Sequence, residues 1–66
     1  MIEITLNGEC HKVEAGSVRE VLERLSRVSE SLLVEHNGEA LHRREWAERL
    51  VREGDRLELL RIVAGG

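Results

Sequence analysis

The chain opens with apolar and polar residues in alternation. The apolar positions are Ile2, Ile4 and Leu6. Alternate side chains of a strand point to opposite faces of its sheet, so this pattern predicts a half-buried strand over residues 1–6. Asn7-Gly8 follows, and this dipeptide favours a two-residue hairpin turn because both of its residues accept a positive φ. A second strand is therefore predicted over residues 9–13.

The two-residue turn also predicts the register of this hairpin. It pairs Ile4 with His11 and Ile2 with Val13, which turns His11 and Val13 toward the core and Cys10 outward. A bulge at the turn would reverse which side chains face inward.

The next segment carries apolar positions at helical spacing. They are Val18, Val21, Leu22, Leu25 and Val28. Spacings of three and four residues align these positions along one stripe, which should cover the sheet. Ser17 and Glu20 form a capping-box pattern, in which each side chain accepts a hydrogen bond from the other residue's amide. A helix is therefore predicted to begin after Ser17 and to run to about Val28.

The middle of the chain predicts a second hairpin and a short helix. Residues 32–36 are apolar enough for a strand, and Asn37-Gly38 is a second turn dipeptide that leads into a short strand around Ala40-Leu41. Trp46 and Leu50 lie at helical spacing and predict a turn or two of helix. We expect Trp46 to fill part of the core.

The final strand is predicted over residues 56–63. Its alternation turns Leu57 and Leu59 toward the core and leaves Leu60 and Ile62 on the opposite, exposed face. Adjacent exposed apolar side chains often mark an interface, so Leu60 and Ile62 are a candidate docking patch. The alternatives are that nearby loops cover them or that they have no function.

The order of these elements predicts an α+β fold. The first and last strands are both strongly apolar, and the simplest sheet places them side by side and parallel at its centre. This is the ubiquitin-like β-grasp arrangement. It has a mixed sheet of four to five strands, one main helix packed on it and a short second helix, in a single domain over residues 1–66.

Size and charge narrow the function. The chain has 66 residues and a net charge of −3. A domain this small buries only about 60% of its unfolded surface and has no room for a deep pocket, so we do not expect an enzyme. The chain has no basic cluster, so nucleic acid is not an expected partner. It has no run of about 18 apolar residues, so no membrane span is predicted. The N-terminus does not resemble a signal peptide, and we expect a cytoplasmic monomer.

From the number and spacing of its cysteine and histidine residues, we expect no metal site, and we expect no bound cofactor. Cys10 is the only cysteine, and the histidines are His11, His36 and His42. Their spacing matches no known zinc pattern. A persulfide-accepting thiolate at Cys10 would need a nearby cation or a helix N-terminus, and packing in the hairpin is the favoured interpretation.

The sequence ends in a di-glycine preceded by small residues. The last four residues are Val63, Ala64, Gly65 and Gly66. Glycine has no Cβ and can approach another surface closely. We interpret residues 63–66 as a flexible tail that carries the terminal carboxylate of Gly66 into a partner's active site. An ordinary frayed terminus is the alternative.

Short segments spread over the whole chain carry a resemblance to a known family. They are Leu6-Asn7-Gly8-Glu9, Ala15-Gly16-Ser17-Val18, Asn37-Gly38-Glu39, Arg43-Arg44-Glu45-Trp46-Ala47, Glu53-Gly54-Asp55 and Val63-Ala64-Gly65-Gly66. Each is weak alone, but in this order and spacing they resemble the ThiS family, the sulfur carriers of thiamine biosynthesis within the ubiquitin-like β-grasp superfamily.

The resemblance implies a role for the chain end. An E1-like adenylyltransferase of the ThiF type would adenylate the Gly66 carboxylate with ATP and Mg. Sulfur from a cysteine desulfurase persulfide would replace the AMP and leave a terminal thiocarboxylate. A thiazole synthase of the ThiG type would then take the sulfur for the thiazole ring. Val63, Ala64 and Gly65 would be the threaded part of the tail.

Three alternatives stay open at this point. The first is a sulfur carrier for molybdopterin, tRNA thiolation or cysteine synthesis. The chain has no proline, whereas the molybdopterin relatives have a proline-containing segment before the terminal glycines, which favours the thiamine branch. The second is a ubiquitin-like protein tag joined to lysines. The third is a plain interaction module, since fold does not determine function.

Overall fold

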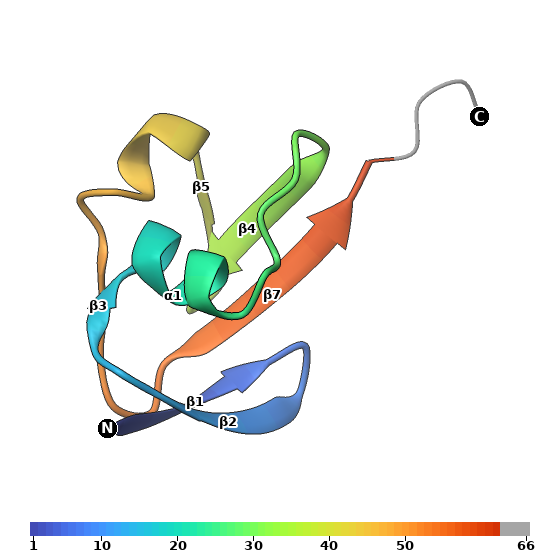
Figure 1. Cartoon of the computed structure of the whole chain (residues 1–66). Helices are drawn as coiled ribbons and strands as arrows, with labels where there is room; N and C mark the ends of the chain where they lie inside the picture. The colour runs from blue at the N-terminus through green and yellow to red at the C-terminus, as the bar shows by residue number, and fades with distance from the viewer. Residues whose placement is uncertain (63–66) are drawn as a thin grey trace.

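Five strands form the main sheet, and one helix lies across one of its faces (Figure 1). The computed structural model describes residues 1–62. The elements are β1 (Ile2–Leu6), β2 (Glu9–Val13), β4 (Leu32–His36), β5 (Glu39–Leu41), β7 (Arg56–Arg61) and α1 (Val18–Arg24). The strand order is β2-β1-β7-β4-β5, with β1 and β7 parallel at the centre and the other neighbours antiparallel. This confirms the predicted α+β β-grasp arrangement.

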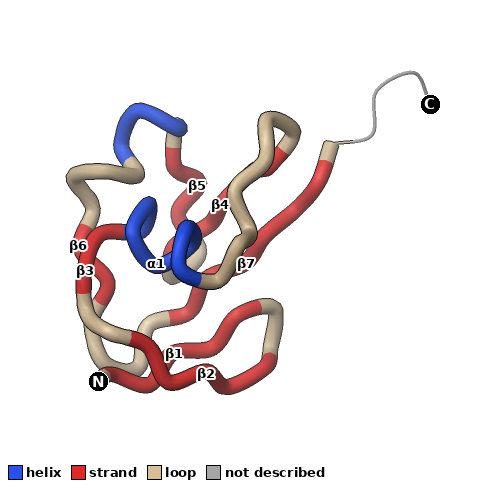
Figure 2. Tube along the Cα trace, viewed as in Figure 1, coloured by secondary structure: helices blue, strands red, loops and turns tan. Residues whose placement is uncertain are grey.

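A second, smaller sheet lies beside α1. It pairs β3 (Gly16–Ser17) antiparallel with β6 (Leu50–Val51), and Figure 2 shows the two strands side by side. This sheet was not predicted from the sequence, because strands of two residues show no periodicity and the pairing joins segments far apart in the chain.

The predicted short helix is a single 3₁₀ turn, η1 (Arg43–Glu45), and Leu50 does not belong to it. Trp46 follows this turn and is 1% exposed, which confirms its place in the core. The Arg43 guanidinium stacks over its ring, 4.4 Å from the centroid. The Trp46 carbonyl accepts a hydrogen bond from the Arg19 amide at 3.0 Å. The segment around Trp46 is therefore tied to the start of α1.

Both predicted Asn-Gly turns are present. Asn7-Gly8 has φ values of 49° and 85°, and Asn37-Gly38 has φ values of 50° and 85°. Positive φ at both central residues suits the twist of a two-residue hairpin. The first hairpin has the predicted register, with Val13 buried and Cys10 exposed.

The two turn asparagines also hold the central strand. The Asn7 side-chain oxygen accepts a hydrogen bond from the Leu59 amide at 2.7 Å. On the opposite side, the Asn37 side-chain oxygen accepts from the Arg56 amide at 2.7 Å. Each turn therefore supplies a hydrogen bond to β7 beyond those of the strand pairs.

The start of α1 is the predicted one. The Ser17 hydroxyl accepts a hydrogen bond from the Glu20 amide at 3.1 Å, and the Glu20 carboxylate accepts from the Ser17 amide at 2.9 Å. These bonds hold the pKa of the Glu20 carboxyl below its ordinary value. The capping box thus satisfies amides that the first turn of a helix leaves without partners.

The predicted end of the helix at about Val28 was wrong, because α1 ends at Arg24. Ser26 adopts a left-handed conformation with a φ of 56°. The Arg27 amide then donates to the Leu22 carbonyl at 2.9 Å. This is the Schellman pattern of a helix end, which glycine usually provides. A serine in that position leaves no composition signal, so the apolar spacing alone overran the helix.

Eleven buried apolar side chains in residues 1–62 form the core between the main sheet and α1. They are Ile4, Leu6, Val13, Val18, Val21, Leu22, Val34, Leu41, Trp46, Val51 and Leu57. Leu57 is fully buried on β7, whereas Leu60 and Ile62 are 55% and 54% exposed, as the alternation predicted. Leu59 packs partly buried against the core. No helix in the described part of the chain has the length and apolarity to cross a membrane.

Leu57 and Leu60 provide a matched test of this packing. Leu57→Ala should lower the free energy of unfolding by about 2–5 kcal/mol, because it leaves a cavity in a well-packed core. Leu60→Ala should change it by less than about 0.5 kcal/mol, because the side chain is mostly solvated. Urea unfolding followed by the fluorescence of the buried Trp46 measures both. Equal losses in the two variants would contradict the assignment of the two faces of β7.

Candidate functional site

The predicted tail lies outside the described residues. It consists of Val63, Ala64, Gly65 and Gly66. The structure does describe the segment that leads to it, which we call the tail base, residues 60–62. Arg61 forms the last residue pair of β7 with Leu32 on β4, and the Ile62 amide donates to the Ser31 carbonyl at 2.9 Å. The tail base is therefore held against the start of β4.

The face of the sheet opposite α1 carries an apolar patch at the tail base. Leu60 and Ile62 belong to it, and the register adds Leu33, which pairs with Leu60 across β4 and β7 and is 48% exposed. We call Leu33, Leu60 and Ile62 the outer apolar patch. Leu33 was not predicted as part of the patch, because only the register of two distant strands shows that it lies beside Leu60. Three neighbouring exposed apolar side chains are suited to docking on another protein.

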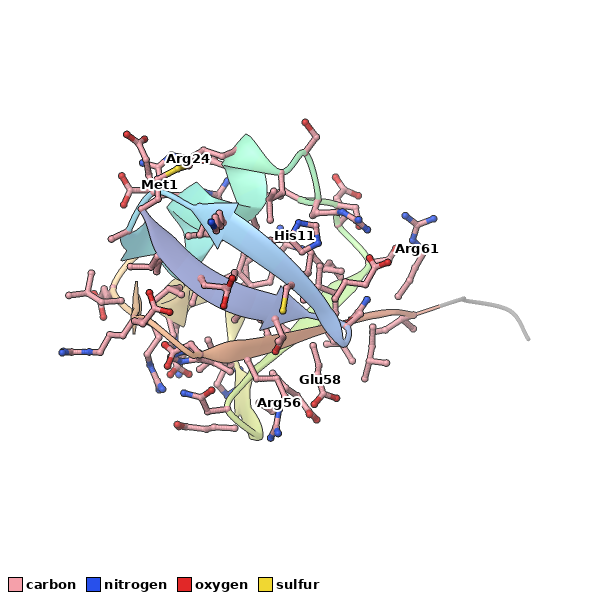
Figure 3. All side chains as sticks on the ribbon, turned by 90° about the horizontal axis from the view of Figure 1, so that it is seen from below. Met1, His11, Arg24, Arg56, Glu58 and Arg61 are labelled. Carbon is pink, nitrogen blue, oxygen red and sulfur yellow. The ribbon has the colours of Figure 1, made fainter. Side chains whose placement is uncertain are left out.

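Acidic side chains lie next to the outer apolar patch. Glu58 pairs with Glu35 across β7 and β4, two residues along both strands from the Leu33–Leu60 pair of the patch. The Glu58 carboxylate also lies 3.2 Å from the Arg56 guanidinium on the same strand. Figure 3 shows Arg56 and Glu58 on one side of the β7 ribbon and Arg61 on the other. The two faces of β7 that lead to the tail base therefore carry different side chains.

The opposite end of β7 is held by a buried polar contact. His36 is 7% exposed, and its Nε2 lies 2.7 Å from Oδ2 of Asp55. Asp55 also accepts hydrogen bonds from the Asn37 side chain at 3.0 Å and from the Arg52 amide at 2.8 Å. Burial of Asp55 acts to raise the pKa of its carboxyl. The hydrogen bonds from Asn37, His36 and the Arg52 amide outweigh this effect and hold the pKa below its ordinary value.

A surface hollow borders this contact, and His36, Asp55, Arg49 and Leu50 are among its lining residues. It lies at the start of β7, away from the tail base. Arg49, which lines it, is already paired, because its guanidinium lies 2.9 Å from the Glu39 carboxylate and 3.7 Å from the Glu45 carboxylate. Since each Asp55 oxygen accepts a hydrogen bond from the fold, we assign the contact to stability.

The structure does not gather cysteine and histidine into a site. Cys10 is exposed on β2, and His36 is buried beside Asp55 on the other side of the sheet centre. His11 faces the core from the first hairpin, and His42 is exposed before η1. Within residues 1–62, no three His, Cys, Asp or Glu side chains come together in a group that could hold a metal ion.

A mixed sheet with parallel central strands, one helix on one face and an apolar patch at the end of the last strand defines a ubiquitin-like β-grasp protein. The ThiS family model matches residues 4–66, so the comparison includes the C-terminal di-glycine. The chain belongs to the ThiS family.

Individual relatives agree with this assignment. The chain is 30% identical over 66 residues to the sulfur carrier protein ThiS of Escherichia coli (strain K12), covering 98% of this chain and all of the relative. The crystal structure of the thiamine biosynthesis protein ThiS from Geobacter metallireducens superposes with a TM-score of 0.88 at 35% identity, covering 98% of this chain and all of that one. The solution structure of a Geobacter metallireducens thiamine biosynthesis protein superposes with a TM-score of 0.77 at 34% identity. This match covers 98% of this chain and 88% of that one.

The Asp55 contact predicts how stability depends on pH. A carboxyl whose pKa is lowered on folding stabilises the fold fully above its ordinary pKa, and this contribution is lost as the pH falls through the folded pKa. Asp55→Asn should therefore destabilise the protein at pH 7 and should make the loss of stability below about pH 5 shallower than in the wild type. Urea unfolding midpoints between neutral and acid pH measure both effects.

Glu39→Gln is the control for this experiment. The Arg49 hydrogen bond and charge lower the pKa of Glu39 as well, but the Glu39 side chain is 61% exposed. Salt screens exposed charges far more than buried ones. In high salt the effect of Glu39→Gln should disappear while that of Asp55→Asn persists. If salt abolished both, the Asp55 contact would be a surface ion pair and not a buried one.

Proposed function

We propose that this protein is a sulfur carrier of thiamine biosynthesis and is not itself an enzyme. Its Gly66 carboxylate is adenylated and then converted to a thiocarboxylate, which donates sulfur for thiazole formation. The observation that carries the proposal is the family match, which extends through the terminal di-glycine. The Escherichia coli relative, which carries the name sulfur carrier protein, supports it over its full length.

The chemistry explains why a carrier needs activation. A carboxylate is a poor electrophile, because an oxide is a poor leaving group at neutral pH. In the first step, an oxygen of the Gly66 carboxylate attacks the α-phosphorus of ATP, and pyrophosphate leaves. The product is a mixed anhydride whose leaving group is AMP. A persulfide sulfur then attacks the carbonyl carbon and displaces AMP. Reductive cleavage of the S–S bond by a thiol leaves the thiocarboxylate.

The catalysts in this scheme are the partners. An E1-like adenylyltransferase of the ThiF type binds ATP, and its Mg ion offsets the phosphate charge during the attack. A cysteine desulfurase supplies the persulfide indirectly, and a thiazole synthase of the ThiG type accepts the sulfur. We place the carrier in the cytoplasm with these partners, as a monomer when alone.

The folded body serves as the docking part of the carrier. An extended segment from Val63 to Gly66 spans about 13 Å at about 3.3 Å per residue. That length reaches into a cleft while the sheet stays outside it. In this scheme the outer apolar patch, next to the tail base, rests on the partner's surface, and the tail brings the Gly66 carboxylate to ATP.

Mass spectrometry tests the proposed chemistry directly. The full chain is incubated with the ThiF-type partner, ATP, Mg, cysteine and a desulfurase, and its intact mass and C-terminal peptide are measured. We expect one oxygen of Gly66 to be replaced by sulfur. A variant that lacks Gly66 should remain unmodified. A branched peptide that joins Gly66 to a lysine would support a protein tag instead, and an unmodified wild-type chain would overturn the carrier proposal.

Docking by the outer apolar patch predicts a loss of affinity without a loss of fold. Leu60→Glu should raise the KM for the carrier in adenylation by about ten-fold or more, because it places a charge in an apolar interface. Leu50→Glu is the matched control, since Leu50 is 57% exposed on β6, outside the patch. Its KM should stay within about two-fold of the wild type. Equal effects of the two substitutions would exclude the patch as the docking surface.

A further inference from the structure

A polar groove lies on the other side of the tail base, between the loop after α1 and the end of β7. Its lining residues are Asn7, Ser26, Arg27, Val28, Ser29, Leu32, Leu59 and Arg61. We call it the tail-base groove. Its lining contains two arginines and no acidic residue, whereas the hollow at the start of β7 contains Glu45, Glu48 and Asp55 beside its arginines. The tail-base groove is therefore a locally cationic site on a chain whose net charge is −3.

Local structure places the two arginines at this groove. Arg27 follows Ser26, whose left-handed conformation ends α1 and turns the chain toward β4. The Arg27 amide is held by the Leu22 carbonyl at 2.9 Å, so its backbone is part of the helix end. Arg61 is the last residue of β7, and Figure 3 shows its side chain on the opposite side of the ribbon from Glu58. Both guanidinium groups thus project from well-defined backbone.

Neither arginine has an ion-pair partner in the described part of the chain. The arginines that do form ion pairs with carboxylates there are Arg19, Arg24, Arg49 and Arg56. Arg27 and Arg61 are both exposed. The groove also contains the Ser29 hydroxyl, which is buried and has no hydrogen-bond partner within residues 1–62. The groove thus offers two exposed guanidinium groups that form no ion pair with the described residues.

The length of the tail makes this groove part of an interface if the proposed function holds. Arg61 lies two residues before Val63, and the tail from Val63 to Gly66 spans only about 13 Å. An enzyme that takes the Gly66 carboxylate into its cleft must therefore bring the rim of that cleft close to Arg61. Covering an unpaired guanidinium removes its hydration without compensation, which opposes binding unless a carboxylate replaces the water.

We propose that the tail-base groove binds aspartate or glutamate side chains on the rim of the enzyme that receives the tail. Arg27 and Arg61 pair with these carboxylates, which the planar guanidinium suits because it can donate two parallel hydrogen bonds. The groove thus adds charge-specific docking on one side of β7 to apolar docking on the other. This inference rests on the proposed function for the identity of the partner.

Carbodiimide coupling tests the contact without depending on the reaction. Arg27→Lys and Arg61→Lys keep the positive charge and supply an amine that couples to a carboxylate in direct contact. With the ThiF-type adenylyltransferase and no ATP, we expect each variant to form an intermolecular cross-link that peptide mapping assigns to the new lysine and an Asp or Glu of the enzyme. Arg44→Lys, at an exposed arginine on η1 outside the groove, is the control and should give no cross-link at its new lysine. The native Lys12 on β2 is present in every sample, so any cross-link at Lys12 is common to the variants and the control.

Charge reversal measures the contribution of the groove. The double variant Arg27→Glu/Arg61→Glu should lower kcat/KM for adenylation about ten-fold or more at low salt, through KM, and should make it less dependent on salt. Arg44→Glu should stay within about two-fold of the wild type. Circular dichroism melting checks that each variant is folded. If the double variant matched Arg44→Glu and the lysine variants gave no intermolecular cross-link, the groove would not be a docking site.

The remaining outcomes separate this inference from the proposed function. Cross-links at the new lysines without adenylation of the wild type would support the groove and overturn the carrier chemistry. Adenylation of the wild type with no effect of either set of variants would support the carrier and overturn the groove. A cross-link within one chain, from Gly66 to a lysine at position 27 or 61, would show that the groove binds the protein's own tail and would overturn the partner contact.

Discussion

The pairing of β7 at the centre of the main sheet determines how this protein presents its end. β7 forms parallel hydrogen bonds with β1 and antiparallel ones with β4. The side chains of Asn7 and Asn37 each add a hydrogen bond to its backbone from the two hairpin turns. Leu57, fully buried, fixes the same strand to the core. Because all of these contacts act on one strand, they hold the tail base in a fixed orientation relative to the rest of the domain.

The two ends of β7 have different physical roles. At its start, the contact between buried His36 and Asp55 joins β4 to the turn before β7, and both carboxylate oxygens of Asp55 accept hydrogen bonds from the fold. At its end, the alternation of the strand separates apolar and cationic groups onto opposite sides. Leu60 lies on the side away from α1, and Arg61 lines the groove beside the loop after α1. The paired polar groups at the start of β7 stabilise the domain, whereas Arg27 and Arg61 near its end form no ion pair within residues 1–62.

The proposed function requires no enclosed active site in this domain. In that proposal the carrier contributes a carboxylate, a tail long enough to enter a cleft and a surface that a partner recognises. The outer apolar patch and the tail-base groove would contact a partner on both sides of one strand. Apolar burial on one side and carboxylate pairing on the other would restrict the orientations of the tail more than either contact alone.

Features that depend on neighbouring residues could be predicted from the amino-acid sequence. The Asn-Gly turns set the register of the first hairpin, the capping box set the start of α1, and alternation separated Leu57 from Leu60. The tertiary structure decided what depends on distant residues or on a rare conformation. A serine with positive φ ended α1 at Arg24, pairing between distant strands placed Leu33 beside Leu60, and packing of the loop after α1 against the end of β7 formed the tail-base groove. Local patterns record backbone preference and burial, whereas a surface shared by several elements exists only once they are packed together.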